Sequence, residues 1–173
     1  MRSLIAGCVL LLASAPAFAQ LALVRSLDFL QGIWVTDDMW GRPAQTAEFH
    51  WTGRQGNAIL MGRYSAGESG ECPSCVTQAV MTAYYDSAAN EVHVRLSDNA
   101  QRTMDFQLES ARSKSAQFVS LAGANRGTYR LTYELLPEDE LVITLERTES
   151  VSEPAFSKVV RWRFHRPGLL HPS

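Results

Sequence analysis

The stretch Ala47–Ser65, AEFHWTGRQGNAILMGRYS, decides the fold. Phe49 and Trp51 alternate with polar neighbours, the segment Gly53–Asn57 interrupts the alternation, and the residues after it resume the pattern. Alternation at period two gives a strand one apolar and one polar face, and a turn rich in glycine and asparagine has the backbone freedom that a hairpin needs. The stretch therefore predicts two antiparallel strands joined by a turn.

The rest of the chain repeats this plan, with alternating runs separated by turn segments such as Ser87–Asn90 and Pro137–Asp139. A short helical turn capped by Ser26 is expected before the first strand. No run after Gly32 has a helical period of useful length, which excludes parallel strands joined by crossover helices. The expected strands cover residues 33–37, 45–52, 57–66, 76–86, 91–96, 104–109, 116–122, 129–135, 141–146 and 160–164.

The apolar side chains fall on one face in strand after strand. A sheet closed on itself needs this pattern, and closure also removes the exposed edges of a long open meander. The sequence therefore predicts an all-β fold, an antiparallel up-and-down β-barrel of about ten strands. A two-sheet sandwich accounts for the same alternation and stays open as the alternative.

The N-terminus predicts a signal peptide over residues 1–19. Arg2 supplies a positive charge, residues 4–13 form a short apolar run, and Ala17-Phe18-Ala19 is an A-x-A cleavage signal. We expect a periplasmic or secreted protein, with residues 20–173 as a single domain and no membrane span in the mature chain. An uncleaved membrane anchor is the weaker alternative. The net charge of −2 comes with no cluster of lysine and arginine, which argues against nucleic acid as a partner.

Cys72 and Cys75 lie in the motif CPSC. In an exported protein such a pair favours a local disulfide. A redox-active pair normally precedes a helix, whereas a strand-like run follows here. A zinc site would need two more ligands at suitable spacing, and the chain has no second CxxC motif. We therefore expect a disulfide between the two cysteines.

Two segments resemble a known family. LDFLQGIW at Leu27–Trp34 resembles the short helix and Gly-x-Trp motif at the start of lipocalin-like (calycin) barrels. EFHW at Glu48–Trp51, followed by GNAILMG at Gly56–Gly62, resembles the second hairpin of bacterial lipocalin-like domains of unknown function. The resemblance implies a barrel that holds a small, mostly apolar molecule, and it implies no established activity.

Lipocalins also carry an arginine near the last strand that packs across the tryptophan of the first strand. Arg161 and Arg163 stand closest to that place, but they alternate with Trp162 and Phe164. We therefore expect both arginines to point outward, which departs from the family pattern.

A ligand site in such a barrel is apolar with a few polar groups that fix orientation. Either Arg63 or Tyr64 is expected to place a polar group in the lumen, as is Tyr84 or its neighbour Tyr85. In the alternative interpretation, the tyrosines simply fill a small barrel and hydrogen-bond at its rim. The candidate ligand-binding residues are Trp34, Trp51, Arg63, Tyr64, Tyr84, Tyr129, Tyr133 and Trp162.

Residues for catalysis or metal binding do not assemble. Glu48 and His50 share a face and could form an acid–base pair, but alternation with Phe49 and Trp51 places them on the wet face. His165 follows the last strand, where the nitrobindin-like branch has its haem ligand, but it is out of phase with the inward set. We expect no enzyme activity, no cofactor and no metal.

Two functions remain. The first is binding of a small apolar or amphipathic molecule inside the barrel, and the second is a ligandless interaction or scaffolding module of the cell envelope. A haem protein or an enzyme is less well supported. Interior volume separates the first two, because ligand pockets usually hold at least about 300 Å³.

Overall fold

The computed structural model describes residues 26–37, 43–53, 58–66, 78–121, 127–148 and 156–168. The predicted signal peptide and the cysteines Cys72 and Cys75 lie outside these residues. In the described part of the chain, no helix has the length and apolar character needed to cross a membrane.

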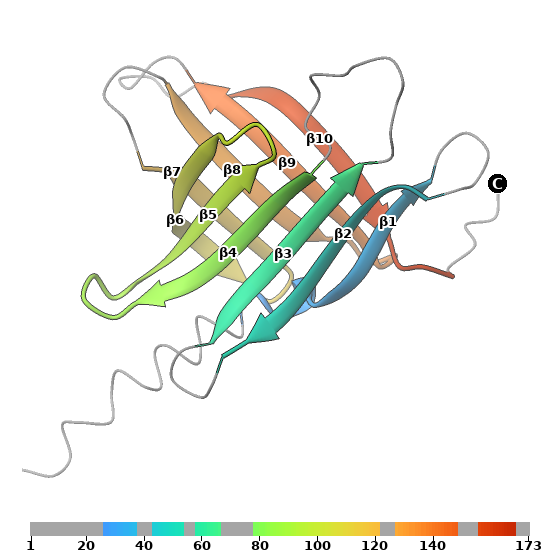
Figure 1. Ribbon diagram of the computed structural model, residues 1–173, viewed down its shortest axis with the longest axis horizontal. Helices are drawn as coiled ribbons and strands as arrows, with labels where there is room; N and C mark the ends of the chain where they lie inside the picture. The colour runs from blue at the N-terminus through green and yellow to red at the C-terminus, as the bar shows by residue number, and fades with distance from the viewer. Residues whose placement is uncertain are drawn as a thin grey trace, which may run out of the picture.

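A single 3₁₀ turn and ten strands make up the described structure (Figure 1). The elements in chain order are η1 (Asp28–Leu30), β1 (Gly32–Asp37), β2 (Pro43–Thr52), β3 (Ile59–Ala66), β4 (Gln78–Asp86), β5 (Glu91–Asp98), β6 (Thr103–Arg112), β7 (Ser115–Ser120), β8 (Thr128–Leu135), β9 (Glu140–Thr148) and β10 (Ser157–His165).

The strands form one closed antiparallel barrel in which each strand lies beside its neighbours in sequence and β10 returns to β1. The predicted all-β barrel is therefore confirmed, and the two-sheet sandwich is not the observed arrangement. The ladders from β1–β2 to β9–β10 are paired along most of their length, whereas β1 and β10 meet only at Val35 and His165.

The hairpin that decides the fold is β2–β3. Phe49 lies directly opposite Gly62 in its register. A Cβ atom on Gly62 would stand 2.8 Å from the Phe49 ring, so the ring fills the space that a larger residue would need. Glycine inside a strand often marks such a close approach. Gly62 therefore lets Phe49 lie flat against the inner wall of the barrel.

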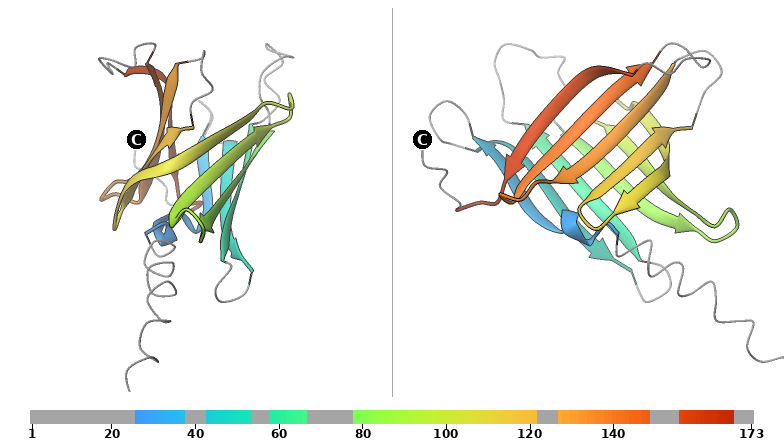
Figure 2. Two further views of the ribbon diagram at one scale, coloured as in Figure 1. Left: turned by 90° about the vertical axis from the view of Figure 1, so that its left-hand side faces the viewer. Right: turned by 180° about the vertical axis from the view of Figure 1, so that it is seen from behind.

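The helical turn plugs one end of the barrel (Figure 2). Leu27 and Leu30 are fully buried and belong to the hydrophobic core. The predicted cap is wrong, because Leu27 rather than Ser26 precedes the turn and no side chain caps it. Burial of two leucines against the core, and not a capping hydrogen bond, holds this turn in place.

Two of the predicted turns are confirmed. The segment after β4 turns at residues 87–90, where Asp86 accepts hydrogen bonds from the backbone N–H groups of Ala88 and Ala89. Asn90 and Asp139 both adopt a left-handed backbone, with φ of 59° and 57°. Asparagine and aspartate tolerate this conformation better than other side-chain-bearing residues, which fits their places in tight hairpins.

Candidate functional site

The two ends of the barrel differ. We call the end that carries η1 and the start of β1 the helix end, and the opposite end the mouth. Because every ladder is antiparallel, β3, β5, β7 and β9 end at the mouth, while β4, β6, β8 and β10 begin there.

Trp34 organises the helix end. Its ring is fully buried, and its Nε1–H donates a hydrogen bond of 2.8 Å to the carbonyl oxygen of Leu30. The Arg166 guanidinium lies over the ring, with 3.7 Å between its central carbon and the ring centroid. Arg166 also donates a 2.9 Å hydrogen bond to the carbonyl oxygen of Gln31. One arginine thus connects the end of β10 to the start of β1.

Gly32 makes this arrangement possible in two ways. Its φ of 118° is one that other residues rarely adopt, and an added Cβ would stand 2.2 Å from Nη1 of Arg166. Loss of water around the guanidinium lowers the pKa of Arg166. The glycine of the Gly-x-Trp motif therefore makes room for the cation that covers the tryptophan.

The arginine that covers Trp34 is therefore Arg166. The alternation of apolar and polar residues in the last strand did not predict this position. Arg161 and Arg163 are exposed, as expected, and Arg163 pairs with Glu140 at 3.4 Å. Arg166 follows the last strand residue, His165, so the two-residue period no longer fixes its direction.

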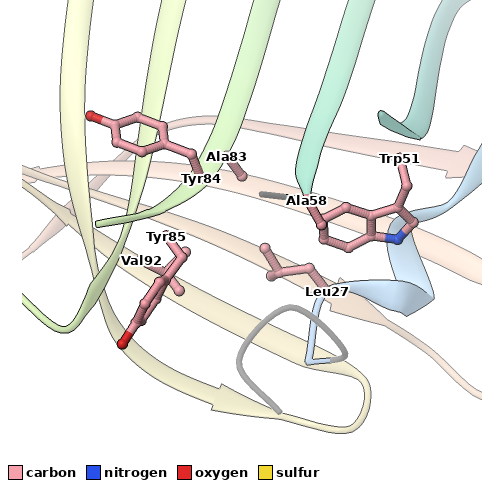
Figure 3. A pocket seen from close by; sticks show the side chains of 7 residues that line it. All are labelled: Leu27, Trp51, Ala58, Ala83, Tyr84, Tyr85 and Val92. Carbon is pink, nitrogen blue, oxygen red and sulfur yellow. The ribbon is translucent and has the colours of Figure 1, made fainter. Parts of the chain in front are cut away.

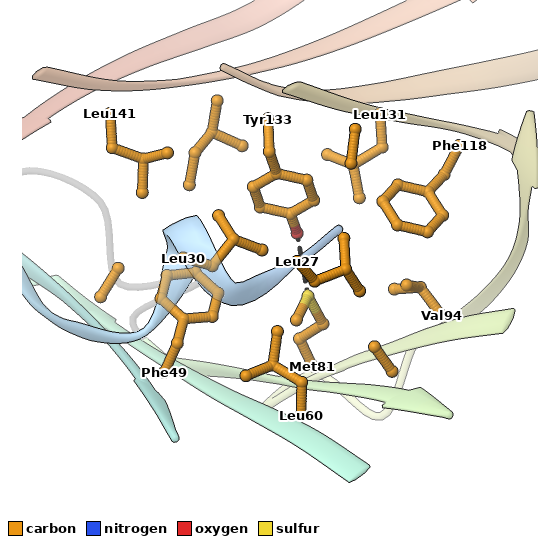
Figure 4. Close-up of a cluster of buried hydrophobic side chains, with 14 of the residues drawn as sticks. Leu27, Leu30, Phe49, Leu60, Met81, Val94, Phe118, Leu131, Tyr133 and Leu141 are labelled. Atoms are coloured by element: carbon orange, nitrogen blue, oxygen red, sulfur yellow. Dashed lines mark hydrogen bonds between the residues drawn. The ribbon is translucent and has the colours of Figure 1, made fainter. Parts of the chain in front are cut away.

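Two tyrosines cross the middle of the barrel. The hydroxyl groups of Tyr64 on β3 and Tyr133 on β8 lie 2.9 Å apart. Tyr133 also donates a hydrogen bond of 3.1 Å to the Met81 sulfur (Figure 4). Phe49 packs edge-on against both tyrosine rings. We call the Tyr64–Tyr133 contact the tyrosine bridge. It separates the fully buried core from the mouth.

Burial raises the pKa of both tyrosines in the bridge. The neighbouring Tyr133 hydroxyl raises the pKa of Tyr64 further. Both hydroxyl groups therefore stay neutral, because ionisation would leave a charge among apolar side chains.

Half-buried apolar side chains line the mouth. They face inward and pack against the core, yet none is fully buried. A cation stands at the rim, where the Arg147 guanidinium lies 5.8 Å from the Tyr129 ring centroid. The mouth residues are Tyr64, Leu96, Met104, Tyr129 and Leu145.

The helix end contains a small cavity of about 10 Å³ (Figure 3). Its lining includes Leu27, Trp51 and Tyr85. A ligand pocket usually holds about 300 Å³ or more, so this space takes at most one water molecule. Trp51 closes the cavity from the side and donates a 2.9 Å hydrogen bond to Asp28. The helix end is therefore a packed plug.

The structure brings only some of the predicted ligand residues together. Tyr64 and Tyr133 meet in the bridge, Tyr129 lies at the mouth, and Trp162 is a half-buried inward residue of β10. Trp34 and Trp51 lie at the helix end instead.

Two predicted residues point away from the lumen. Arg63 is exposed on the outer face, and Tyr84 stacks on His93 there, with ring centroids 5.8 Å apart. The inward neighbours are Tyr64 and Tyr85, because strand residues alternate between faces. Arg63 and Tyr84 therefore supply no polar group to the lumen.

The histidines and the acidic residue considered for chemistry also lie outside the lumen. Glu48 and His50 are exposed, and His165 contacts the backbone carbonyl of Arg166 through Nδ1 at 3.0 Å. The structure therefore gives no support to an acid–base pair of Glu48 and His50. Among the described residues, no three His, Cys, Asp or Glu side chains gather closely enough to hold a metal ion.

No protein-family model matches the chain, and no curated protein matches it.

Proposed function

We propose that this protein is an exported, lipocalin-like barrel that binds a small apolar or amphipathic molecule at its mouth. The contrast between the two ends carries this proposal. Leu27, Leu30 and Trp34 are fully buried at the helix end, with half-buried Trp51 and Tyr85 beside them, whereas the mouth residues all keep part of their surface free. A partly exposed apolar surface inside a concave wall favours apolar ligands.

The contact of Arg166 with Trp34 supports the lipocalin-like part of the proposal. The sequence carries the Gly-x-Trp motif, and the fold supplies the arginine that such barrels pack across the tryptophan. A Cβ at Gly32 would meet the Arg166 guanidinium where it now lies, so the glycine of the motif favours this contact. This support concerns the architecture. The proposal that a ligand binds rests on the mouth residues alone.

A fluorescence titration with the neutral apolar probe N-phenyl-1-naphthylamine (NPN) tests binding at the mouth. We expect saturable binding to the unmodified chain. Met104→Gln puts a polar amide at the mouth and should weaken binding about tenfold, because the amide loses water when a ligand covers it. Ile33→Gln is the matched control on the outer face, where Ile33 is 50% exposed, and it should leave binding unchanged. Absence of saturable binding, or equal effects of both substitutions, would contradict the proposal.

A packed barrel that acts through its surface is the second candidate. The observation in its favour is the filled helix end, where the cavity measures about 10 Å³. This candidate predicts no saturable NPN binding and no small molecule retained in the native mass of the purified protein.

Export rests on residues 1–19 of the sequence. We expect cleavage before Gln20 and a disulfide between Cys72 and Cys75. The denatured mass of the protein expressed with its own leader measures both. A mass that includes residues 1–19 would contradict cleavage, and two additional hydrogen masses would contradict the disulfide.

A further inference from the structure

The tyrosine bridge is part of a longer chain of hydrogen bonds. The Tyr64 and Tyr133 hydroxyl oxygens lie 2.9 Å apart, and the Tyr133 oxygen lies 3.1 Å from the Met81 sulfur. The Tyr64 oxygen is farther from the same sulfur, at 3.8 Å. Because hydrogen bonds weaken with distance, the sulfur is the partner of Tyr133. The chain therefore leads from Met81 through Tyr133 to Tyr64.

The sulfur fixes the direction in which this chain donates. A thioether accepts hydrogen bonds but has no proton to donate, and a tyrosine hydroxyl has only one. Tyr133 uses its proton on the Met81 sulfur, so the contact between the two hydroxyl groups uses the proton of Tyr64. Among the described residues, no donor contacts the Tyr64 oxygen. This oxygen therefore keeps its capacity to accept a hydrogen bond.

Tyr64 is the end of the chain that faces the mouth. Tyr133 is 1% exposed, whereas Tyr64 is half-buried. Alanines surround Tyr64 on the inner wall. Ala47 of β2 and Ala79 of β4 are its paired neighbours, and Ala66 is the next inward residue of β3 toward the mouth. Alanine side chains cover little of a neighbouring tyrosine, which accounts for the surface that Tyr64 keeps exposed.

The apolar surroundings make a hydrogen bond to this oxygen selective. The other mouth residues offer mainly apolar surface to a ligand. A ligand that covers the Tyr64 oxygen without donating to it removes water from an acceptor and leaves that acceptor unsatisfied, which lowers affinity. The Tyr64 hydroxyl is also a stronger acceptor because it donates to Tyr133 at the same time.

We propose that the ligand of the mouth is an apolar molecule with a hydroxyl or N–H group, and that this group donates a hydrogen bond to the Tyr64 oxygen. This inference rests on the proposed ligand-binding function. It names the polar group of the ligand, which apolar contacts with the mouth residues do not specify.

Displacement of NPN by 4-propylphenol and by 4-propylanisole tests the inference. The two compounds share an apolar body and differ in the methylation of one oxygen, so only the phenol has a proton to donate. We call the ratio of the anisole Kd to the phenol Kd the phenol preference. Differences in the hydration of the two compounds cancel when this ratio is compared between protein variants. Circular dichroism checks the fold of each variant.

Tyr64→Phe removes the accepting oxygen. We expect it to lower the phenol preference about fivefold, which is the effect of losing one hydrogen bond. Tyr85→Phe is the matched control, because the Tyr85 hydroxyl bonds to Asn90 at the surface. It should change the phenol preference by less than about 1.5-fold, since no hydrogen bond of the mouth is lost.

Met81→Leu tests the direction of the chain with little change in side-chain volume. Without the sulfur, Tyr133 can donate to Tyr64, and the Tyr64 proton can turn toward the ligand. That proton binds the oxygen of the anisole as well as the oxygen of the phenol, so the phenol preference should fall at least about twofold. Met61→Leu on the outer face is the matched control and should leave the preference unchanged.

Two results would overturn the inference in different ways. A phenol preference that is the same in the unmodified protein, in Tyr64→Phe and in Met81→Leu would overturn the hydrogen bond to Tyr64 and leave ligand binding intact. Absence of saturable NPN binding to the unmodified protein would overturn the ligand-binding function and the inference together.

Discussion

The helix end and the mouth are built by the same ten strands but differ in what fills them. At the helix end, Leu27, Leu30 and Trp34 are buried completely, and Arg166 seals the rim. At the mouth, inward side chains such as Met104 and Leu145 keep part of their surface exposed. The tyrosine bridge marks the boundary between the two regions.

This difference shows that one repeating strand pattern can build two ends that are packed differently. Apolar and polar residues alternate in the strands around the barrel. At a few positions, glycines replace side chains of this pattern and allow close packing. Gly32 and Gly62 admit Arg166 and Phe49 into places where a side chain of their own would collide. Among the described residues, no element equivalent to η1 lies at the mouth. The substitutions below test this division, beginning with the largest effect.

Phe49→Ala should give the largest loss of stability. The ring is fully buried and packs against both bridge tyrosines. Truncation of a buried phenylalanine leaves a cavity and lowers the free energy of unfolding by about 4 kcal/mol. Urea denaturation measures the change. Leu145→Ala at the mouth is the comparison variant. We expect it to lower the free energy of unfolding by less than half as much as Phe49→Ala does. Equal losses would show that the mouth is packed as tightly as the core.

Arg166→Gln should cost about 2 kcal/mol, because it removes both the cation over the Trp34 ring and a charged hydrogen bond to Gln31. The control is Arg161→Gln, an exposed arginine of β10, with an expected change within about 0.5 kcal/mol. Thermal unfolding of the two variants measures both changes in stability. A similar small change in both would mean that Arg166 does not stabilise the helix end.

Tyr133→Phe should lower the free energy of unfolding by about 1 kcal/mol, since it leaves the Tyr64 hydroxyl with only the Met81 sulfur, 3.8 Å away, as a partner. The Tyr64→Phe and double variants complete a cycle that measures the coupling. Tyr85→Phe serves as the control, because the Tyr85 hydroxyl bonds to exposed Asn90 at the surface and should contribute little. Strict additivity of the two bridge substitutions would argue against the bridge in solution.

The bridge also predicts a dependence of stability on alkaline pH. Burial raises the pKa of Tyr64 and Tyr133 above that of an unfolded tyrosine. Below about pH 10, both states keep the proton and stability is unaffected; above it, the unfolded state loses protons that the folded state retains. Stability should therefore fall as the pH rises above that value. Urea denaturation across this range should show a shallower fall for the Tyr64→Phe/Tyr133→Phe variant, and identical slopes would contradict the account.

Sequence periodicity was sufficient to predict the barrel. The β2–β3 hairpin, the strand succession and the outward direction of Glu48 and His50 all follow from alternation, because a strand has only two faces. Contacts between distant strands did not follow from it. Nothing in the sequence pairs Tyr64 with Tyr133, since their meeting depends on how the barrel closes and not on local pattern.

Local irregularity explains the remaining differences. Arg166 lies just past a strand end, and the helical turn is held by buried leucines in place of the expected Ser26 cap. The pairing of Val35 on β1 with His165 on β10 depends on where the two strands begin and end, which the alternation of either strand does not specify. Glycines within apolar strands are the one sequence signal that could have indicated the tight contacts of Phe49 and Arg166.

The most direct test of the central claim uses the methionines as reporters of where a ligand sits. Met104 lies at the mouth, Met81 lies fully buried under the tyrosine bridge, and Met61 lies on the outer face. With protein isotope-labelled at the methionine methyl groups, an NMR titration with NPN should shift the Met104 signal most and leave Met61 unchanged. A Met104 signal that stays in place at saturating NPN, or a Met61 shift of the same size, would contradict binding at the mouth.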